Sequence, residues 1–285
     1  MRHQYFSLLA IASLFLMHCQ AKPQPIQIQA IKDADTVISH RHDTSIIVNG
    51  IECYIQFPES KNVVGDLLLL PGWDFSNRKW CDSSSVCKTA LLKGYRVVAP
   101  QMGRSVYASS YFPETRKDLS RFPTLPQLDS ALELLKKELG FFKRKNLILG
   151  LSTGGRGVAL ICERKPDWFH AAAALSGDYN QVSMPKDNLM NLVYGPYAGH
   201  AVRWKQTDNP QTDANKLNTP IYLGHGQRDR IVPHTQTIDF AHTLKAEKNR
   251  MSEVVLHINP AAGHDFNYWR SELPAVWKFF EKHTN

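Results

Sequence analysis

The feature that most constrains the fold is a regular alternation of short apolar segments with helix-forming segments. From residue 63 onward, short apolar runs stop at glycine, proline or polar residues, and most are followed by apolar residues at helical spacing. Short, continuously apolar strands are typical of a parallel sheet that helices cover on both faces. We expect strands within 63–73, 95–100, 146–151, 170–177, 220–226 and 253–260, and helices at 83–93, 125–139, 154–163, 234–248 and 273–283, the last entered through Pro274.

Residues 44–58 precede this alternation and are rich in β-forming residues. Asn49 and Gly50 stand in the middle of the stretch, and both tolerate the positive φ of a type I′ turn, which predicts a β-hairpin. The length of 285 residues and the apolar content of 43% suit one large domain. We therefore expect one α/β domain over 44–285, with an N-terminal hairpin and a mostly parallel central sheet.

The first residues are typical of an export signal. Arg2 precedes an apolar run at 6–17 that is too short to span a bilayer as a helix but suits the core of a signal peptide. We expect residues 1–18 to be that signal and the protein to be exported, to the periplasm of a bacterium, to its membrane or out of the cell.

The cleavage site has two interpretations. Leu16 and Cys19 resemble a lipoprotein signal, in which the cysteine is lipidated, although His18 stands where a small residue is expected. Ordinary cleavage after Ala21 is the alternative. In either case residues 19–43 begin as a polar, proline-containing stretch, which predicts a tether, attached to a membrane if Cys19 carries a lipid.

The charge and the cysteines predict neither a nucleic-acid partner nor a metal. The formal net charge is +8, but the densest basic run is only "KRK" at 143–145. Cys81 and Cys87 bracket "DSSSV" and could pair in an oxidising compartment, whereas Cys53 and Cys162 fall in expected core elements. The chain has no Cys-x-x-Cys or His-x-x-x-His pair, so we expect no structural zinc. We also expect no cofactor, because the serine chemistry inferred below needs none.

Three of the expected strands are followed by residues that can form a nucleophilic triad. Ser152, Asp229 and His264 each come after a strand, and ligands of parallel sheets lie beyond these carboxyl ends. A serine hydroxyl needs an imidazole to take its proton, and the imidazole needs an acid to fix its tautomer. A glycine-rich turn alone could be structural, but the three residues together predict a catalytic triad. Asp178 also follows a strand and is the alternative acid.

Four motifs resemble those of the α/β-hydrolase superfamily over about residues 44–283. "GLSTGG" resembles its nucleophile elbow, "HGQRDRIVP" its acid loop and "GHDF" its histidine loop. "LLPGWDF" is similar to its oxyanion strand end, with Pro71 where a histidine often stands. The resemblance implies an α/β-hydrolase fold, and backbone N–H groups of Trp73 and Thr153 as oxyanion donors.

The same resemblance implies a serine hydrolase that forms an acyl-enzyme on Ser152. The second glycine of the elbow, Gly155, also occurs in prolyl-oligopeptidase-like and dienelactone-hydrolase-like branches. We expect a carboxylesterase acting on a small-molecule or peptide acyl substrate. A peptidase or amidase, an acyltransferase, and a binding protein that has lost catalysis are the alternatives.

Two segments are expected to shape the substrate site. Residues 101–123 are rich in aromatics, and 178–218 lie where the superfamily inserts a cap. Arginines near the expected site could receive an acidic group or make ordinary surface contacts, and the aromatics could line a cleft or simply pack the cap. The residues concerned are Arg104, Arg156, Arg228, Tyr107, Tyr111, Phe112, Tyr194, Tyr197 and Trp204.

Overall fold

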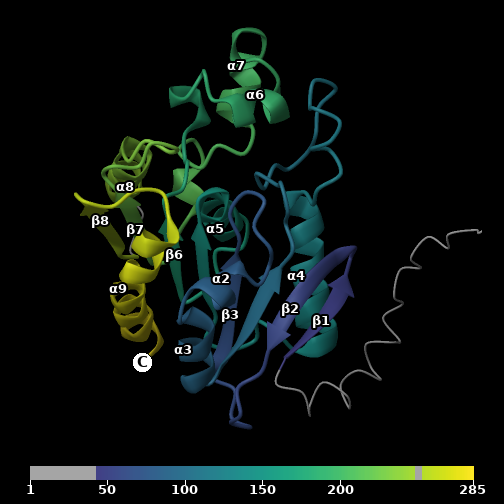
Figure 1. Cartoon of the computed structure of the whole chain (residues 1–285), viewed down its shortest axis with the longest axis vertical. Coiled ribbons are helices and arrows are strands. Elements are labelled where there is room, and N and C mark those ends of the chain that lie inside the picture. Colours follow the sequence, from purple (N-terminus) through teal and green to yellow (C-terminus); the bar gives the residue numbers. More distant parts are fainter. Residues whose placement is uncertain (1–42, 248–251) are drawn as a thin grey trace, which may run out of the picture.

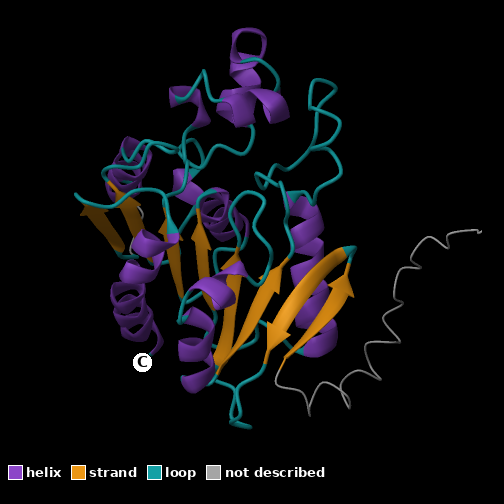
Figure 2. Cartoon of the chain, in the orientation of Figure 1, coloured by secondary structure: helices purple, strands orange, loops and turns teal. Residues whose placement is uncertain are grey.

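The computed structural model describes residues 43–247 and 252–285, so the expected signal, Cys19 and nearly all of the expected tether lie outside the described residues. Within the described ranges, one eight-stranded sheet has the order β1-β2-β4-β3-β5-β6-β7-β8 (Figure 2). β1 is antiparallel to β2 and β2 to β4, and all other neighbours are parallel. The strands are β1 (Asp43–Val48), β2 (Ile51–Gln56), β3 (Gly65–Leu70), β4 (Tyr95–Pro100), β5 (Leu147–Leu151), β6 (Ala171–Leu175), β7 (Ile221–Gly226) and β8 (Val254–Asn259).

The predicted N-terminal hairpin is confirmed. Val48 pairs with Ile51, so the turn contains two residues, and both have positive φ, 49° at Asn49 and 76° at Gly50. This is the conformation of a type I′ turn, in which a residue other than glycine, asparagine or aspartate would be strained.

Helices cover both faces of the sheet, as the continuously apolar strands predict. Leu68 and Leu70 of β3 point into one core, with the helices α4, α5 and α8, while Leu67 and Leu69 point into the other, with α2, α3 and α9 (Figure 1). The period of two along a strand therefore divides one apolar run between two cores. The helices are α2 (Lys79–Ser83), α3 (Val86–Leu92), α4 (Leu125–Leu139), α5 (Thr153–Arg164), α8 (Thr235–Ala246) and α9 (Phe266–Thr284).

The last helix begins earlier than its sequence predicts. The start expected at 273, next to Pro274, is wrong, because α9 begins at Phe266 and holds Pro274 in its interior. The Asp265 side chain caps the helix by accepting the backbone N–H groups of Asn267 and Tyr268. The cap and the buried rings of the first turns thus fix the start, and the proline is tolerated further along.

The segment from 178 to 218, called the cap segment below, joins β6 to β7. It carries two short helices, α6 (Asn188–Tyr194) and α7 (Tyr197–Gln206), which lie beyond the carboxyl ends of the strands (Figure 1). Tyr194, Tyr197 and Trp204 of this segment form a separate apolar cluster with residues of the 101–123 segment. The cap segment therefore lies on the side of the sheet where the triad residues are expected.

The structure pairs Cys81 with Cys87 in a disulfide across the junction of α2 and α3, with Cα atoms 5.1 Å apart. The thiols of Cys53 and Cys162 are buried in the core. Among the described helices, none combines the length and the apolar character that crossing a membrane requires.

Candidate active site

Ser152 occupies a strained turn between β5 and α5. Its φ of 54° and ψ of −126° are unfavourable for a residue with a side chain, as is typical of the serine in a nucleophile elbow. The flanking glycines allow the sharp turn, because a Cβ on Gly150 would lie 2.2 Å from the carbonyl oxygen of Gly154. A Cβ on Gly154 would in turn lie 2.5 Å from the carbonyl oxygen of Leu70. The turn at Ser152 therefore requires glycine at both flanking positions, as the sequence predicts.

The three residues predicted to form a triad are joined by hydrogen bonds. His264 Nε2 lies 3.0 Å from Ser152 Oγ, and His264 Nδ1 lies 2.6 Å from Asp229 Oδ2. The three residues follow β5, β7 and β8, so parallel strands bring them to one edge of the sheet. Ser152 and Asp229 are buried, and 12% of the His264 side chain is exposed. This arrangement can transfer a proton from the hydroxyl to the imidazole.

The Asp229 carboxylate is held in place from all sides. Its Oδ1 accepts backbone N–H groups from Ile231, at 2.8 Å, and from Val232, at 2.9 Å. Burial alone would raise the pKa of this carboxyl, but hydrogen bonds from His225 and His264 outweigh burial and hold the pKa well below its ordinary value. Asp229 is therefore a negative charge beside His264 at neutral pH.

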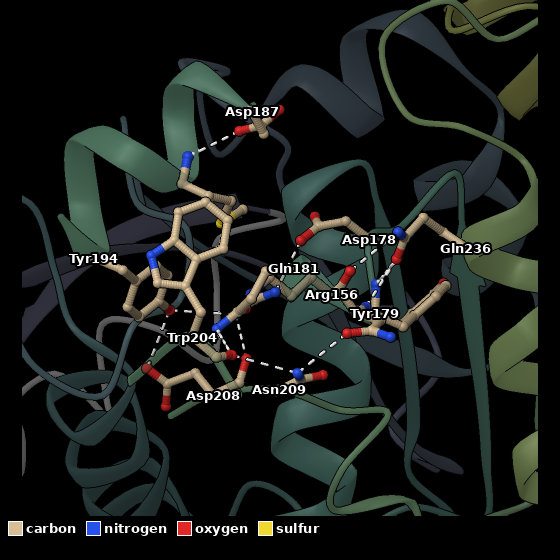
Figure 3. Close-up of polar contacts among 12 residues, drawn as sticks. Arg156, Asp178, Tyr179, Gln181, Asp187, Tyr194, Trp204, Asp208, Asn209 and Gln236 are labelled. Atoms are coloured by element: carbon tan, nitrogen blue, oxygen red, sulfur yellow. Dashed lines mark hydrogen bonds and ion pairs between the residues drawn. The ribbon is translucent and has the colours of Figure 1, made fainter. Parts of the chain in front are cut away.

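The alternative acid, Asp178, is engaged elsewhere. Its Oδ2 lies 2.8 Å from Nη1 of the fully buried Arg156, and the two form an ion pair between α5 and the cap segment (Figure 3). Burial raises the pKa of Asp178, and the Arg156 guanidinium opposes that effect. The carboxylate placed against His264 is thus that of Asp229.

The backbone N–H groups of Trp73 and Thr153 are available as oxyanion donors. Neither group donates a hydrogen bond to another residue within the described ranges. A Cβ on Gly72 would lie 3.2 Å from Ser152 Cβ, so the loop that carries Trp73 passes directly beside the nucleophile. Thr153 begins α5, whose N-terminus carries partial positive charge. Both predicted donors therefore adjoin the place where negative charge would develop.

Most of the aromatic residues considered for a cleft pack the cap instead. Tyr194 and Trp204 are completely buried in the cap cluster, and the Trp204 indole donates to the Gly195 carbonyl oxygen. Tyr107 is also completely buried, but in the main core, where its hydroxyl donates to the Pro71 carbonyl oxygen. Of the arginines, Arg156 is internal, Arg104 pairs at the surface with Asp74, and Arg228 is exposed. None of these side chains contacts the triad through a described hydrogen bond.

The half-buried aromatics Trp73, Phe75 and Phe266 belong to two different clusters. Trp73 packs against the cluster of the cap segment, whereas Phe75 and Phe266 pack against the core under α9. The Trp269 and His264 rings pack edge to face, with centroids 5.1 Å apart, so the indole supports the imidazole. The sequence gives no periodic signal for Phe266 or Trp269 as site residues, because their positions depend on where α9 begins.

His225 is a further residue near the triad that the sequence analysis missed. It precedes Asp229 by four positions and is completely buried, with Nε2 3.1 Å from Asp229 Oδ2. Its position within "HGQRD" is a signal that could have identified it, because a polar residue at the end of a buried strand needs a polar partner.

Comparisons with known proteins identify the family and the fold. The model of the prolyl oligopeptidase family matches residues 83–285. A search of curated proteins found no match. Among solved structures, the chain is similar to a ferulic acid esterase, with 18% identity and a TM-score of 0.60 over 85% of this chain and 97% of that one.

Two further structures show the same fold. An S-formylglutathione hydrolase from Agrobacterium tumefaciens is 13% identical, with a TM-score of 0.66 over 85% of this chain and 95% of that one. The acylaminoacyl peptidase of Pyrococcus horikoshii is 15% identical, with a TM-score of 0.64 over 88% of this chain and 43% of that one. The family match covers more than two thirds of the chain, so this protein belongs to the prolyl oligopeptidase family of serine hydrolases and has the α/β-hydrolase fold.

Proposed function

We propose that the protein is a carboxylesterase that uses Ser152, His264 and Asp229 as its catalytic triad. The observation that carries the proposal is the unbroken series of hydrogen bonds from Ser152 Oγ through His264 to an ionised Asp229. It is supported by the two backbone N–H groups beside the nucleophile, which have no hydrogen-bond partner in the described part of the chain.

The geometry supports a two-step acyl transfer. Ser152 Oγ attacks the acyl carbon while His264 Nε2 takes the hydroxyl proton, and the N–H groups of Trp73 and Thr153 receive the oxyanion. His264 then gives its proton to the departing oxygen, which leaves an ester on Ser152. Water, deprotonated by His264, attacks that ester, and His264 returns the proton to the departing Ser152 Oγ as the carboxylic acid is released. Asp229 stabilises the imidazolium in both steps.

An ester is favoured over an amide by the fold comparisons. The ferulic acid esterase and the S-formylglutathione hydrolase are matched over 97% and 95% of their chains, whereas the acylaminoacyl peptidase is matched over 43% of its chain. A peptidase or amidase on the same triad remains the second candidate, because the family match itself points to it.

Intact mass after exposure to a fluorophosphonate tests the nucleophile. We expect one adduct on the wild type and none on Ser152→Ala. A folded wild-type protein without an adduct would contradict the proposal and favour a binding protein. Initial rates on p-nitrophenyl acetate and p-nitroacetanilide, which differ only in the scissile bond, then separate esterase from amidase.

We propose further that the protein is exported and that the apolar run at 6–17 directs it. The mass of the mature N-terminus distinguishes the two cleavage sites. A lipidated Cys19 gives a diacyl or triacyl mass and a membrane fraction that Cys19→Ser abolishes, whereas cleavage after Ala21 gives an unmodified chain beginning at Lys22. An unprocessed chain that retains Met1 in the cytoplasm would contradict export.

A further inference from the structure

The environment of His225 assigns its tautomer. Its Nε2 lies 3.1 Å from Asp229 Oδ2 and 3.0 Å from the carbonyl oxygen of Val232. A carbonyl oxygen and an ionised carboxylate can only accept hydrogen bonds, so Nε2 must carry a hydrogen. Its Nδ1 lies 2.6 Å from Thr237 Oγ1, a hydroxyl that is able to donate. The surroundings thus suit a neutral imidazole with its hydrogen on Nε2.

This hydrogen completes the set of donors around the triad acid. Oδ2 of Asp229 accepts from both His264 and His225, and Oδ1 accepts from the N–H groups of Ile231 and Val232. A carboxylate offers about four acceptor sites, so the group is saturated and cannot rotate without losing a bond. Val232 links the two groups, because its N–H donates to Asp229 Oδ1 and its carbonyl oxygen accepts from His225 Nε2.

We propose that His225 is a positioning residue of the triad, which fixes the plane of the Asp229 carboxylate against His264 while remaining neutral itself. The inference rests on the proposed function. A neutral donor leaves the full charge of Asp229 to stabilise the His264 imidazolium, whereas a cationic His225 would compete for it. His225 touches no substrate and acts only through Asp229.

The test compares variants that keep or remove the donor. His225→Leu removes the Nε2–H, and His225→Gln replaces it with an amide N–H. His257→Gln is the matched control, because His257 also binds a carboxylate, Glu272, at 2.9 Å, but lies outside the triad. The readouts are kcat and KM on p-nitrophenyl acetate, the rate of fluorophosphonate labelling and the melting temperature, all at a temperature where each variant is folded.

We expect His225→Leu to lower kcat and the labelling rate by about 10- to 100-fold with little change in KM, as is typical when a group that orients a site residue is lost. His225→Gln should recover most of the rate, and His257→Gln should match the wild type. Unchanged kcat in His225→Leu, or equal losses in the Leu and Gln variants that follow their melting temperatures, would overturn the proposal.

Two measurements keep the proposal open to refutation if His225→Leu does not fold. Thr237→Val leaves all triad atoms in place and removes only the hydroxyl that faces Nδ1, so we expect a smaller loss in kcat at constant KM, and no loss would contradict the proposal. In the wild type, ¹⁵N shifts of His225 should report hydrogen on Nε2, and a hydrogen on Nδ1 alone would overturn it. A wild type that neither reacts with fluorophosphonate nor cleaves the ester would instead refute the proposed function, while the ¹⁵N result would still stand.

Discussion

Arg156 and Asp178 form an ion pair that joins the nucleophile helix to the cap segment and is shielded from water, with Nη1 2.8 Å from Oδ2. The same guanidinium donates to the side chain of Gln181 and to the carbonyl oxygen of Asp208, both in the cap segment (Figure 3). A single positive charge, four residues after Ser152, therefore fixes the cap to the body.

Replacing one partner of this pair should destabilise the protein strongly. Arg156→Leu leaves Asp178 buried without its counter-ion, and we expect the free energy of unfolding to fall by about 3–5 kcal/mol. Urea denaturation measures it, with the exposed Arg228→Ala as the control. The double variant Arg156→Leu/Asp178→Leu should lose less than the sum of the single changes, and strictly additive losses would contradict a paired charge.

The two candidate acids should respond oppositely in activity. Asp229→Asn offers His264 an amide in place of a carboxylate, which favours the wrong tautomer, so we expect kcat on p-nitrophenyl acetate to fall by about 10⁴-fold. Asp178→Asn should cost stability but leave the kcat of the folded protein within a small factor of the wild type. The reverse pattern would move the acid to Asp178.

The lowered pKa of Asp229 predicts a contribution to stability that depends on pH. Since the folded-state pKa lies below the unfolded value of about 3.9, ionised Asp229 stabilises the fold above that pH. The contribution is lost as the pH falls through the unfolded value toward the folded one. The difference in unfolding free energy between the wild type and Asp229→Asn should therefore shrink on acidification below about pH 4. A difference in unfolding free energy that stays constant down to pH 2 would argue against stabilisation by ionised Asp229.

The elbow glycine should not tolerate a methyl group. Gly154→Ala would place Cβ 2.5 Å from the carbonyl oxygen of Leu70, which is backbone and cannot move aside cheaply, so we expect lost stability and lost fluorophosphonate labelling. Gly199→Ala is the matched control, because a Cβ there meets nothing within 4 Å. It should be neutral or stabilising by up to about 1 kcal/mol. Equal behaviour of the two variants would contradict a steric role for Gly154.

The triad residues can be predicted from the sequence because the features that position them are local. The glycines at 150 and 154 leave room for a sharp turn at Ser152, and the residue pattern alone indicates that turn. The parallel sheet follows from short apolar strands, and it brings Asp229 and His264 to the same edge as the serine. The positions of the triad residues can thus be predicted from the parallel order of the strands alone, without knowledge of how the side chains pack.

What the sequence could not predict depends on long-range packing. The burial of Arg156 requires partners at 178, 181, 194 and 208, which lie in the cap segment, whose short helices and loops follow a course that no periodicity reveals. The start of α9 is hard to predict because Pro274 is a strong local signal for a helix start, while the Asp265 cap is a weaker one. The aromatics of the cap were ambiguous for the same reason, since a tyrosine that lines a cleft and one that packs a cap are alike in sequence.

The hydrogen bond between Ser152 and His264 joins residues 112 positions apart, and the histidine follows β8, the last strand of the sheet. A chain that has folded only through β7 contains the serine but has no base to activate it. In the proposed mechanism the nucleophile therefore becomes reactive only after β8 and the loop that follows it have joined the sheet, so a chain that is still folding cannot cleave the acyl compounds it meets.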